Sequence, residues 1–124
     1  MPGLVLDGKK IATQIETELA EEVADFVQNN GEGPTLAAVL VGDDPASAVY
    51  VHNKNQSCVK AGMLSLHEHL AVSTSQAELL DLIARLNADR SVHGILVQLP
   101  LPPQIDETVV LDAVSPLKDV DCFH

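Results

Sequence analysis

The stretch TLAAVLV, Thr35 to Val41, decides the fold class of this chain. Every residue after Thr35 is apolar, Pro34 precedes the run and Gly42 follows it. A short, continuous apolar run between turn residues is typical of a strand that is buried on both faces, as in a parallel sheet. We therefore expect this stretch to be a fully buried strand.

The segments on either side alternate between helical and strand patterns. Val92–Val97 (VHGILV) is a second clean apolar run, and Met63–Val72 is a less regular one with two histidines and a glutamate inside it. Helical patterns cover four segments: one from Asp7-Gly8 to the stop at Asn29–Gly31, one over about 46–60, one that begins at the capping box Ser75–Glu78, and a short one near Glu107–Val114. This order indicates a parallel sheet with right-handed crossovers. We predict an α/β fold: a three-layer α-β-α domain over residues 1–124 with an open, mostly parallel sheet.

The first helix is expected to be amphipathic. Apolar residues recur at helical spacing on one side, and glutamates occupy the other. The pattern predicts that the apolar stripe packs inward; its members are Ile11, Ile15, Leu19, Val23, Phe26 and Val27.

Composition excludes several classes of protein. The 124 residues are 46% hydrophobic, which argues against a disordered tail, and carry 18 acidic against 7 basic side chains, for a net charge of −11. Such a chain is not expected to bind nucleic acid or an anionic membrane through its overall field. No apolar run approaches the roughly 18 residues of a membrane span, and the first residues lack a secretory pattern. Cys58 and Cys122 form no CxxC pair, so we expect a reduced, cytoplasmic protein.

The carboxyl ends of the expected strands mark the candidate site, because open parallel sheets bind ligands there. Ser47, Tyr50 and Lys54 follow the first strand at i, i+3 and i+7, so they share one helix face. Tyrosine offers a ring for stacking, and an amine that is partly removed from water exchanges protons near neutral pH. By spacing alone, a solvated lysine beside an amphipathic tyrosine is the commoner arrangement.

Other polar residues near these strand ends are weaker candidates. Gln98 ends an apolar strand before a stiff proline run and would either orient a ligand or cap the strand. Asp121 would either accept hydrogen bonds from a heterocycle or remain solvated. His67 and His69 are two apart on a strand and could share a face and bind a metal, but a third ligand is not found nearby in sequence, so we expect no metal site. Cys58 is expected to pack within its helix.

Three long stretches carry a more specific signal. They are VGDDPASAVYVHNKNQSCVKAGM (Val41–Met63), HGILVQLPLPPQID (His93–Asp106) and SPLKDVDCFH (Ser115–His124). In this order they resemble signatures of the bifunctional methylenetetrahydrofolate dehydrogenase/methenyltetrahydrofolate cyclohydrolases, and LDGKKIA (Leu6–Ala12) is similar to the opening of that family.

The resemblance implies an enzyme of one-carbon folate metabolism. The implied reactions are the oxidation of 5,10-methylenetetrahydrofolate by a nicotinamide cofactor, usually NADP, and hydrolysis of the methenyl product to 10-formyltetrahydrofolate. Tetrahydrofolate is the implied substrate, and a homodimer is implied for the complete enzyme.

The resemblance also implies roles for individual residues. Lys54 matches the catalytic lysine and Gln98 the glutamine that bonds it. Tyr50 matches the tyrosine that stacks on the aminobenzoate ring, and Asp121 the aspartate that anchors the pterin. The site is bordered by Ser47, Leu99 and Pro100.

Two departures from the family pattern accompany these matches. Cys122 stands where the family has a glycine that permits a positive φ, and a Cβ there could disturb the pterin pocket. Family members also continue into a Rossmann-type domain, and this sequence has no G-x-G-x-x-G. We therefore expect no cofactor-binding residue in this chain and no dehydrogenase step from it alone. A folate-binding module without catalysis, or an oligomerising fragment, is the alternative.

Overall fold

The computed structural model describes residues 3–123 and has a three-stranded parallel sheet at its centre. The strands are β1 (Thr35–Val41), β2 (Leu64–Leu70) and β3 (Gly94–Val97), in the order β2-β1-β3. Thr35 pairs with Leu64 on one side of β1, and Leu36 pairs with Gly94 on the other. The stretch TLAAVLV is therefore the central strand, and the predicted parallel sheet is confirmed.

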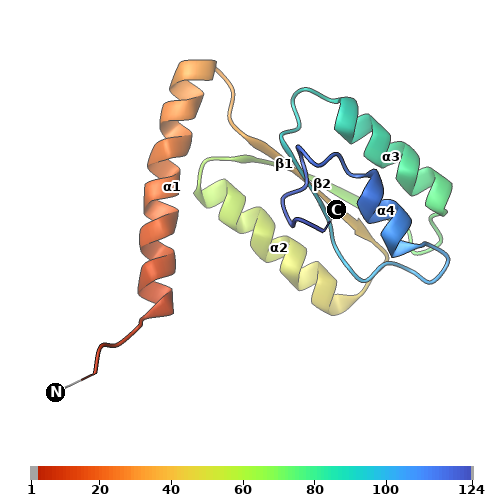
Figure 1. The fold of residues 1–124 in the computed structure, drawn as a ribbon, viewed down its shortest axis with the longest axis horizontal. Helices are drawn as coiled ribbons and strands as arrows, with labels where there is room; N and C mark the ends of the chain where they lie inside the picture. The colour runs from red at the N-terminus through yellow and green to blue at the C-terminus, as the bar shows by residue number, and fades with distance from the viewer. Residues whose placement is uncertain (1–2, 124) are drawn as a thin grey trace.

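Helices cover both faces of the sheet (Figure 1). α2 (Pro45–Lys60) packs on one face, where Val51 meets Ala38, Leu40 and Leu96. α3 (Gln76–Ala88) and α4 (Glu107–Ala113) pack on the other face, against the alternate residues of the same strands. Successive side chains of a strand point to opposite faces, so one apolar run supplies both cores. The three-layer α-β-α architecture is confirmed.

α1 (Gly8–Asn30) differs from the expectation for its apolar stripe. The helix forms as predicted, with Asp7 capping its start and Gly31 ending it at φ 79°. It stands beside the sheet in Figure 1 rather than on a face of it, and Val23 is its one buried residue. The predicted inward packing is wrong for four members of the stripe, which remain 38–57% exposed: Ile11, Ile15, Leu19 and Phe26. Contacts near its end hold the helix, such as the edge-to-face pair of Phe26 with His93 at 6.4 Å.

β2 is an edge strand and is largely uncovered. Its residues are either exposed or half-buried, which explains why a strand can contain His67, Glu68 and His69. β3 begins at Gly94, two residues later than the apolar run predicts, although Val92 is fully buried. Within residues 3–123, none of the helices combines the length and the apolar character needed to span a membrane.

Candidate active site at the carboxyl edge of the sheet

A tight turn places α2 directly after the carboxyl end of β1. Gly42 has φ 92°, a left-handed conformation that glycine adopts without steric cost, and its N–H donates to the Leu70 carbonyl at 2.9 Å. The Asp44 carboxylate then accepts from the Ser47 N–H at 2.9 Å, with Pro45 in the first turn. Asp44-Pro45 is thus a helix cap followed by a residue pre-organised for a helix, and it sets where Tyr50 and Lys54 lie.

Lys54 and Gln98 meet at this edge. The Lys54 Nζ donates to Gln98 Oε1 at 3.1 Å, although the two residues are 44 positions apart. Gln98 is held at the end of β3, because its N–H donates to the Val39 carbonyl at 2.9 Å. Both side chains are partly buried. The sheet order β2-β1-β3 produces this contact by placing the end of β3 beside the start of α2.

The Leu99 carbonyl fixes the orientation of the Gln98 amide. Gln98 Nε2 donates to this oxygen at 3.2 Å, which turns Oε1 toward the lysine. The Ser47 hydroxyl donates to the same oxygen at 3.3 Å, and Ser47 is only 2% exposed. Ser47, Leu99, Gln98 and Lys54 therefore form one connected set of polar contacts.

Tyr50 and Pro100 border this set of contacts. Tyr50 precedes Lys54 by four residues, so the two side chains project from the same side of α2. Tyr50 is 58% exposed, which leaves its ring available to a ligand. The Leu99–Pro100 peptide bond is cis, and Pro100 is exposed.

The C-terminal segment runs beside the first residues of β3. Asp119 forms an isolated parallel bridge with Ile95, whose N–H donates to the Lys118 carbonyl at 2.7 Å. Val120, the residue before Asp121, lines a pocket with Leu36 and Gly94, near the amino ends of β1 and β3. Asp121 is half-buried. Cys122 follows it at φ 58°, in the left-handed region that favours the glycine of the family pattern.

Two residues that stabilise the site were missed in the sequence. The Lys118 ammonium donates to the carbonyls of Leu86 and Asp89, at 3.0 and 2.8 Å, and so fixes the segment before Asp121. Gln104 Nε2 donates to the Val72 and Thr74 carbonyls and joins the proline segment to the loop after β2. A lone lysine in an acidic terminal segment was the available signal for Lys118; the sequence offers none for Gln104.

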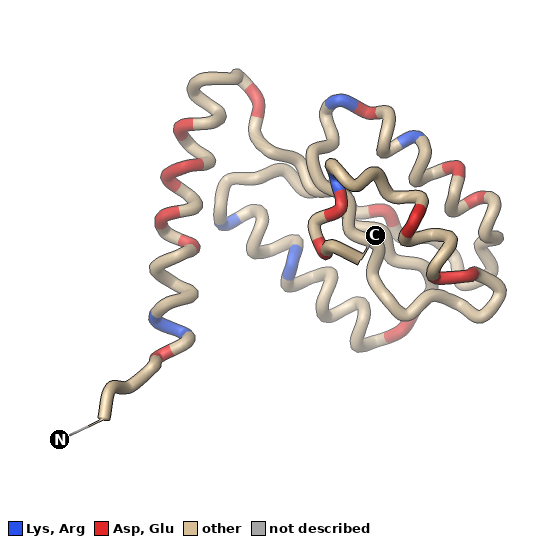
Figure 2. The backbone as a smooth tube through the Cα atoms, in the orientation of Figure 1, with Lys and Arg blue, Asp and Glu red and all other residues tan. Residues whose placement is uncertain are grey.

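Charge distinguishes α2 from the other helices. Figure 2 shows acidic residues on α1, α3 and α4, whereas α2 carries Lys54 and Lys60 without a single acidic side chain. In a chain of net charge −11, α2 is therefore a helix whose own side chains carry positive charge.

The remaining candidate residues have structural surroundings. Burial raises the pKa of the Cys58 thiol. This residue lies on the buried side of α2, as expected. His67 and His69 stack on each other with ring centroids 6.1 Å apart. Across residues 3–123, histidine, cysteine and carboxylate side chains form no group of three that could hold a metal ion.

Comparisons with known proteins agree on one family. Residues 6–121 match the model of the tetrahydrofolate dehydrogenase/cyclohydrolase catalytic domain. A bifunctional protein FolD of Rhodopirellula baltica is 55% identical over 99% of this chain and 43% of its own length.

Solved structures show the same fold. The bifunctional methylenetetrahydrofolate dehydrogenase/cyclohydrolase FolD of Campylobacter jejuni is 47% identical, with a TM-score of 0.91 over 95% of this chain and 42% of that one. The Trypanosoma brucei enzyme, solved with NADP and an inhibitor, is 36% identical with a TM-score of 0.91, over 98% of this chain and 42% of that one. The chain thus spans less than half the length of these relatives. It belongs to the tetrahydrofolate dehydrogenase/cyclohydrolase family, and nearly all of it matches the catalytic domain.

Proposed function

We propose that this domain binds a reduced folate at the carboxyl edge of its sheet and that Lys54 transfers the protons of methenyltetrahydrofolate hydrolysis. The 3.1 Å contact between Lys54 Nζ and Gln98 Oε1 carries this proposal, because it places a partly buried amine beside an uncharged partner. Family membership supplies the substrate class.

The chemistry of the substrate suits this pair. The methenyl carbon is cationic and open to attack by water, and an uncharged amine beside it can take up the proton that water gives off. Water adds its oxygen to this carbon and gives one proton to the Lys54 amine. The bond from the carbon to N5 then breaks, the second proton of water moves to N5, and the formyl group remains on N10. The Gln98 amide orients the amine without favouring its charged form as a carboxylate would.

The other site residues have binding roles in this proposal. Tyr50 stacks on the aminobenzoate ring, and Asp121 accepts hydrogen bonds from the pterin. Ser47, Leu99 and Pro100 form the wall of the site. The exposure of Tyr50 and the polar contact of Ser47 with Leu99 support the roles of these residues, and the role of Asp121 rests on its match to the family pattern.

NADP is the proposed cofactor of the dehydrogenase step, supported by the NADP-bound relative from Trypanosoma brucei. The β1–α2 turn does not fit a dinucleotide, because its sequence is Gly42-Asp43-Asp44-Pro45 and its carboxylates stand where a helix start would have to accept a pyrophosphate. We therefore assign the folate-binding half of the site to this chain. In this proposal residues 1–124 form one catalytic domain. We place the protein in the cytoplasm, which its two free cysteines support.

The proposal is tested by the absorbance of 5,10-methenyltetrahydrofolate, which is lost on hydrolysis. Wild-type chain should accelerate the loss, and Lys54→Met should abolish the acceleration while the circular dichroism spectrum is kept. Lys60→Met, on the same helix, is the control and should hydrolyse normally. Full turnover by Lys54→Met would exclude the lysine from the mechanism, and binding without turnover by wild type would favour a folate-binding module.

A second candidate function is self-association through α1. Its exposed apolar residues (Ile11, Ile15, Leu19 and Phe26) favour burial against another surface, and a homodimer is the proposed assembly. Light scattering of the wild-type chain and of Ile15→Glu tests it: a dimer that dissociates in the variant supports association, and a monomeric wild type contradicts it.

A further inference from the structure

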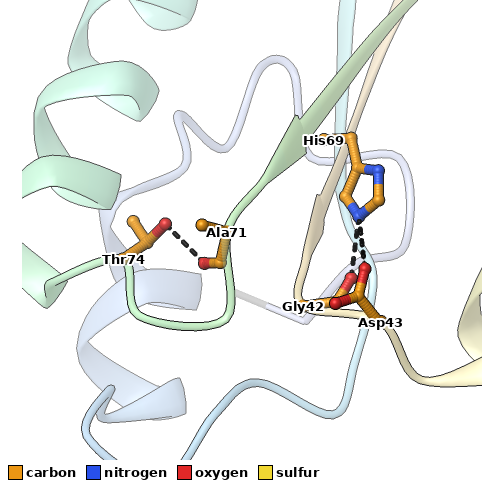
Figure 3. A network of polar contacts seen from close by, with 5 residues as sticks. All are labelled: Gly42, Asp43, His69, Ala71 and Thr74. Atoms are coloured by element: carbon orange, nitrogen blue, oxygen red, sulfur yellow. Dashed lines mark hydrogen bonds and ion pairs between the residues drawn. The ribbon is translucent and has the colours of Figure 1, made fainter.

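The turn between β1 and α2 is held from the end of β2 (Figure 3). The Gly42 N–H donates to the Leu70 carbonyl at 2.9 Å, and the Gly42 carbonyl lies 2.8 Å from His69 Nε2. Since a carbonyl oxygen only accepts, Nε2 carries a proton and donates. Both backbone polar groups of Gly42 are therefore bonded to the same strand.

His69 makes this bond without help from its neighbour. The ring of His67 lies nearly parallel to that of His69, with centroids 6.1 Å apart, but the hydrogen bond to the turn comes from His69. Asp43 Oδ1 also lies 3.5 Å from His69 Nε2, but the two side chains are 84% and 48% exposed, so this contact contributes little. The bond to the Gly42 carbonyl is the shorter contact, and it acts on a glycine whose backbone would otherwise be unusually free.

Polar contacts connect this turn to the proposed catalytic pair. The turn ends at Asp44, which caps α2 through the Ser47 N–H. The Ser47 hydroxyl donates to the Leu99 carbonyl, which also accepts from Gln98. Gln98 in turn accepts from Lys54. A shift of the turn would therefore move the start of α2 and disturb the Gln98 amide.

We propose that His69 is a positioning residue for the folate site: its Nε2–H holds the Gly42 carbonyl and so keeps the start of α2, with Ser47, in register with Leu99 and Gln98. This inference rests on the proposed function. It gives His69 a role that is distinct from metal binding. The two-residue spacing of His67 and His69 in the sequence could not reveal this role.

The test uses three variants of the 124-residue chain and 5,10-methenyltetrahydrofolate as the probe. His69→Ala should weaken binding or slow hydrolysis per folded site by about two- to tenfold, the range for loss of one hydrogen bond. His69→Gln should restore both, because the glutamine Nε2 can still donate to the carbonyl. His67→Ala removes the neighbouring imidazole of the same strand and should behave as wild type.

Dissociation constants and rate constants per folded site separate positioning from a loss of folded protein, which changes neither. His69→Ala equal to wild type, His69→Gln equal to His69→Ala, or His67→Ala as impaired as His69→Ala would each overturn the inference. These outcomes leave the effect of Lys54→Met intact. A wild-type chain without affinity for the probe would instead overturn the proposed function, and the role of His69 with it.

Discussion

The hydroxyl of Ser47 and the backbone carbonyl of Leu99 connect α2 to the end of β3. Their 3.3 Å hydrogen bond is formed by a serine that is 2% exposed, and the same carbonyl accepts from Gln98 Nε2. The orientation of the glutamine amide, and through it the position of Lys54 Nζ, thus depends on a serine in the first turn of α2.

Ser47→Ala tests this relationship. The change removes one buried donor, so the free energy of unfolding should fall by about 1 kcal/mol, and hydrolysis of the methenyl compound should slow by about two- to tenfold. Urea denaturation and absorbance kinetics measure the two effects. Ser57→Ala, at an exposed position of the same helix, is the control and should change neither.

Tyr50→Ala should weaken binding of the reduced folate by roughly 1–3 kcal/mol, from loss of the stacking contact and of its buried area. Titration calorimetry gives the dissociation constant. Tyr50→Phe keeps the ring and should bind nearly as well as wild type. Equal affinity of Tyr50→Ala and wild type would show that the ring does not touch the ligand.

Cys122→Gly should stabilise the chain. The φ of 58° at this position costs an L-residue about 1–2 kcal/mol, and glycine avoids that cost while losing some of the gain to its larger backbone entropy. We expect a net gain of about 0.5–1 kcal/mol in urea denaturation. Cys122→Ser retains the Cβ and should give no gain; a gain in both variants would point to the thiol rather than the backbone.

The two thiols should differ in reactivity. Burial raises the pKa of the Cys58 thiol and hides its sulfur, whereas Cys122 is exposed. A chromogenic disulfide reagent at pH 8 should modify Cys122 at once and Cys58 only on unfolding.

Because the pKa of Cys58 is raised on folding, its contribution to stability is present below the ordinary thiol pKa and is lost as pH rises through the folded value. In Cys122→Ser, Cys58 is the sole thiol, and fast modification of it in the folded chain would contradict the burial of its sulfur.

Local patterns were sufficient for most elements of the fold. The apolar run of β1 and the capping residues Asp7, Asp44 and Ser75 act within a few positions of the chain, so they can be read without knowledge of the fold. The shared face of Tyr50 and Lys54 has the same origin, because a helix alone brings residues four apart together.

Strand order and packing partners were decided by tertiary structure. Periodicity shows that one side of an element is apolar, but it does not show what covers that side. For this reason the exposed stripe of α1 and the edge position of β2 could not be predicted. His69 and Gly42 are 27 positions apart in the chain, and Lys54 and Gln98 are 44 positions apart, yet each pair is hydrogen-bonded. Such contacts depend on which strands are neighbours, and that is settled by the packing of the whole chain rather than by any local stretch of it.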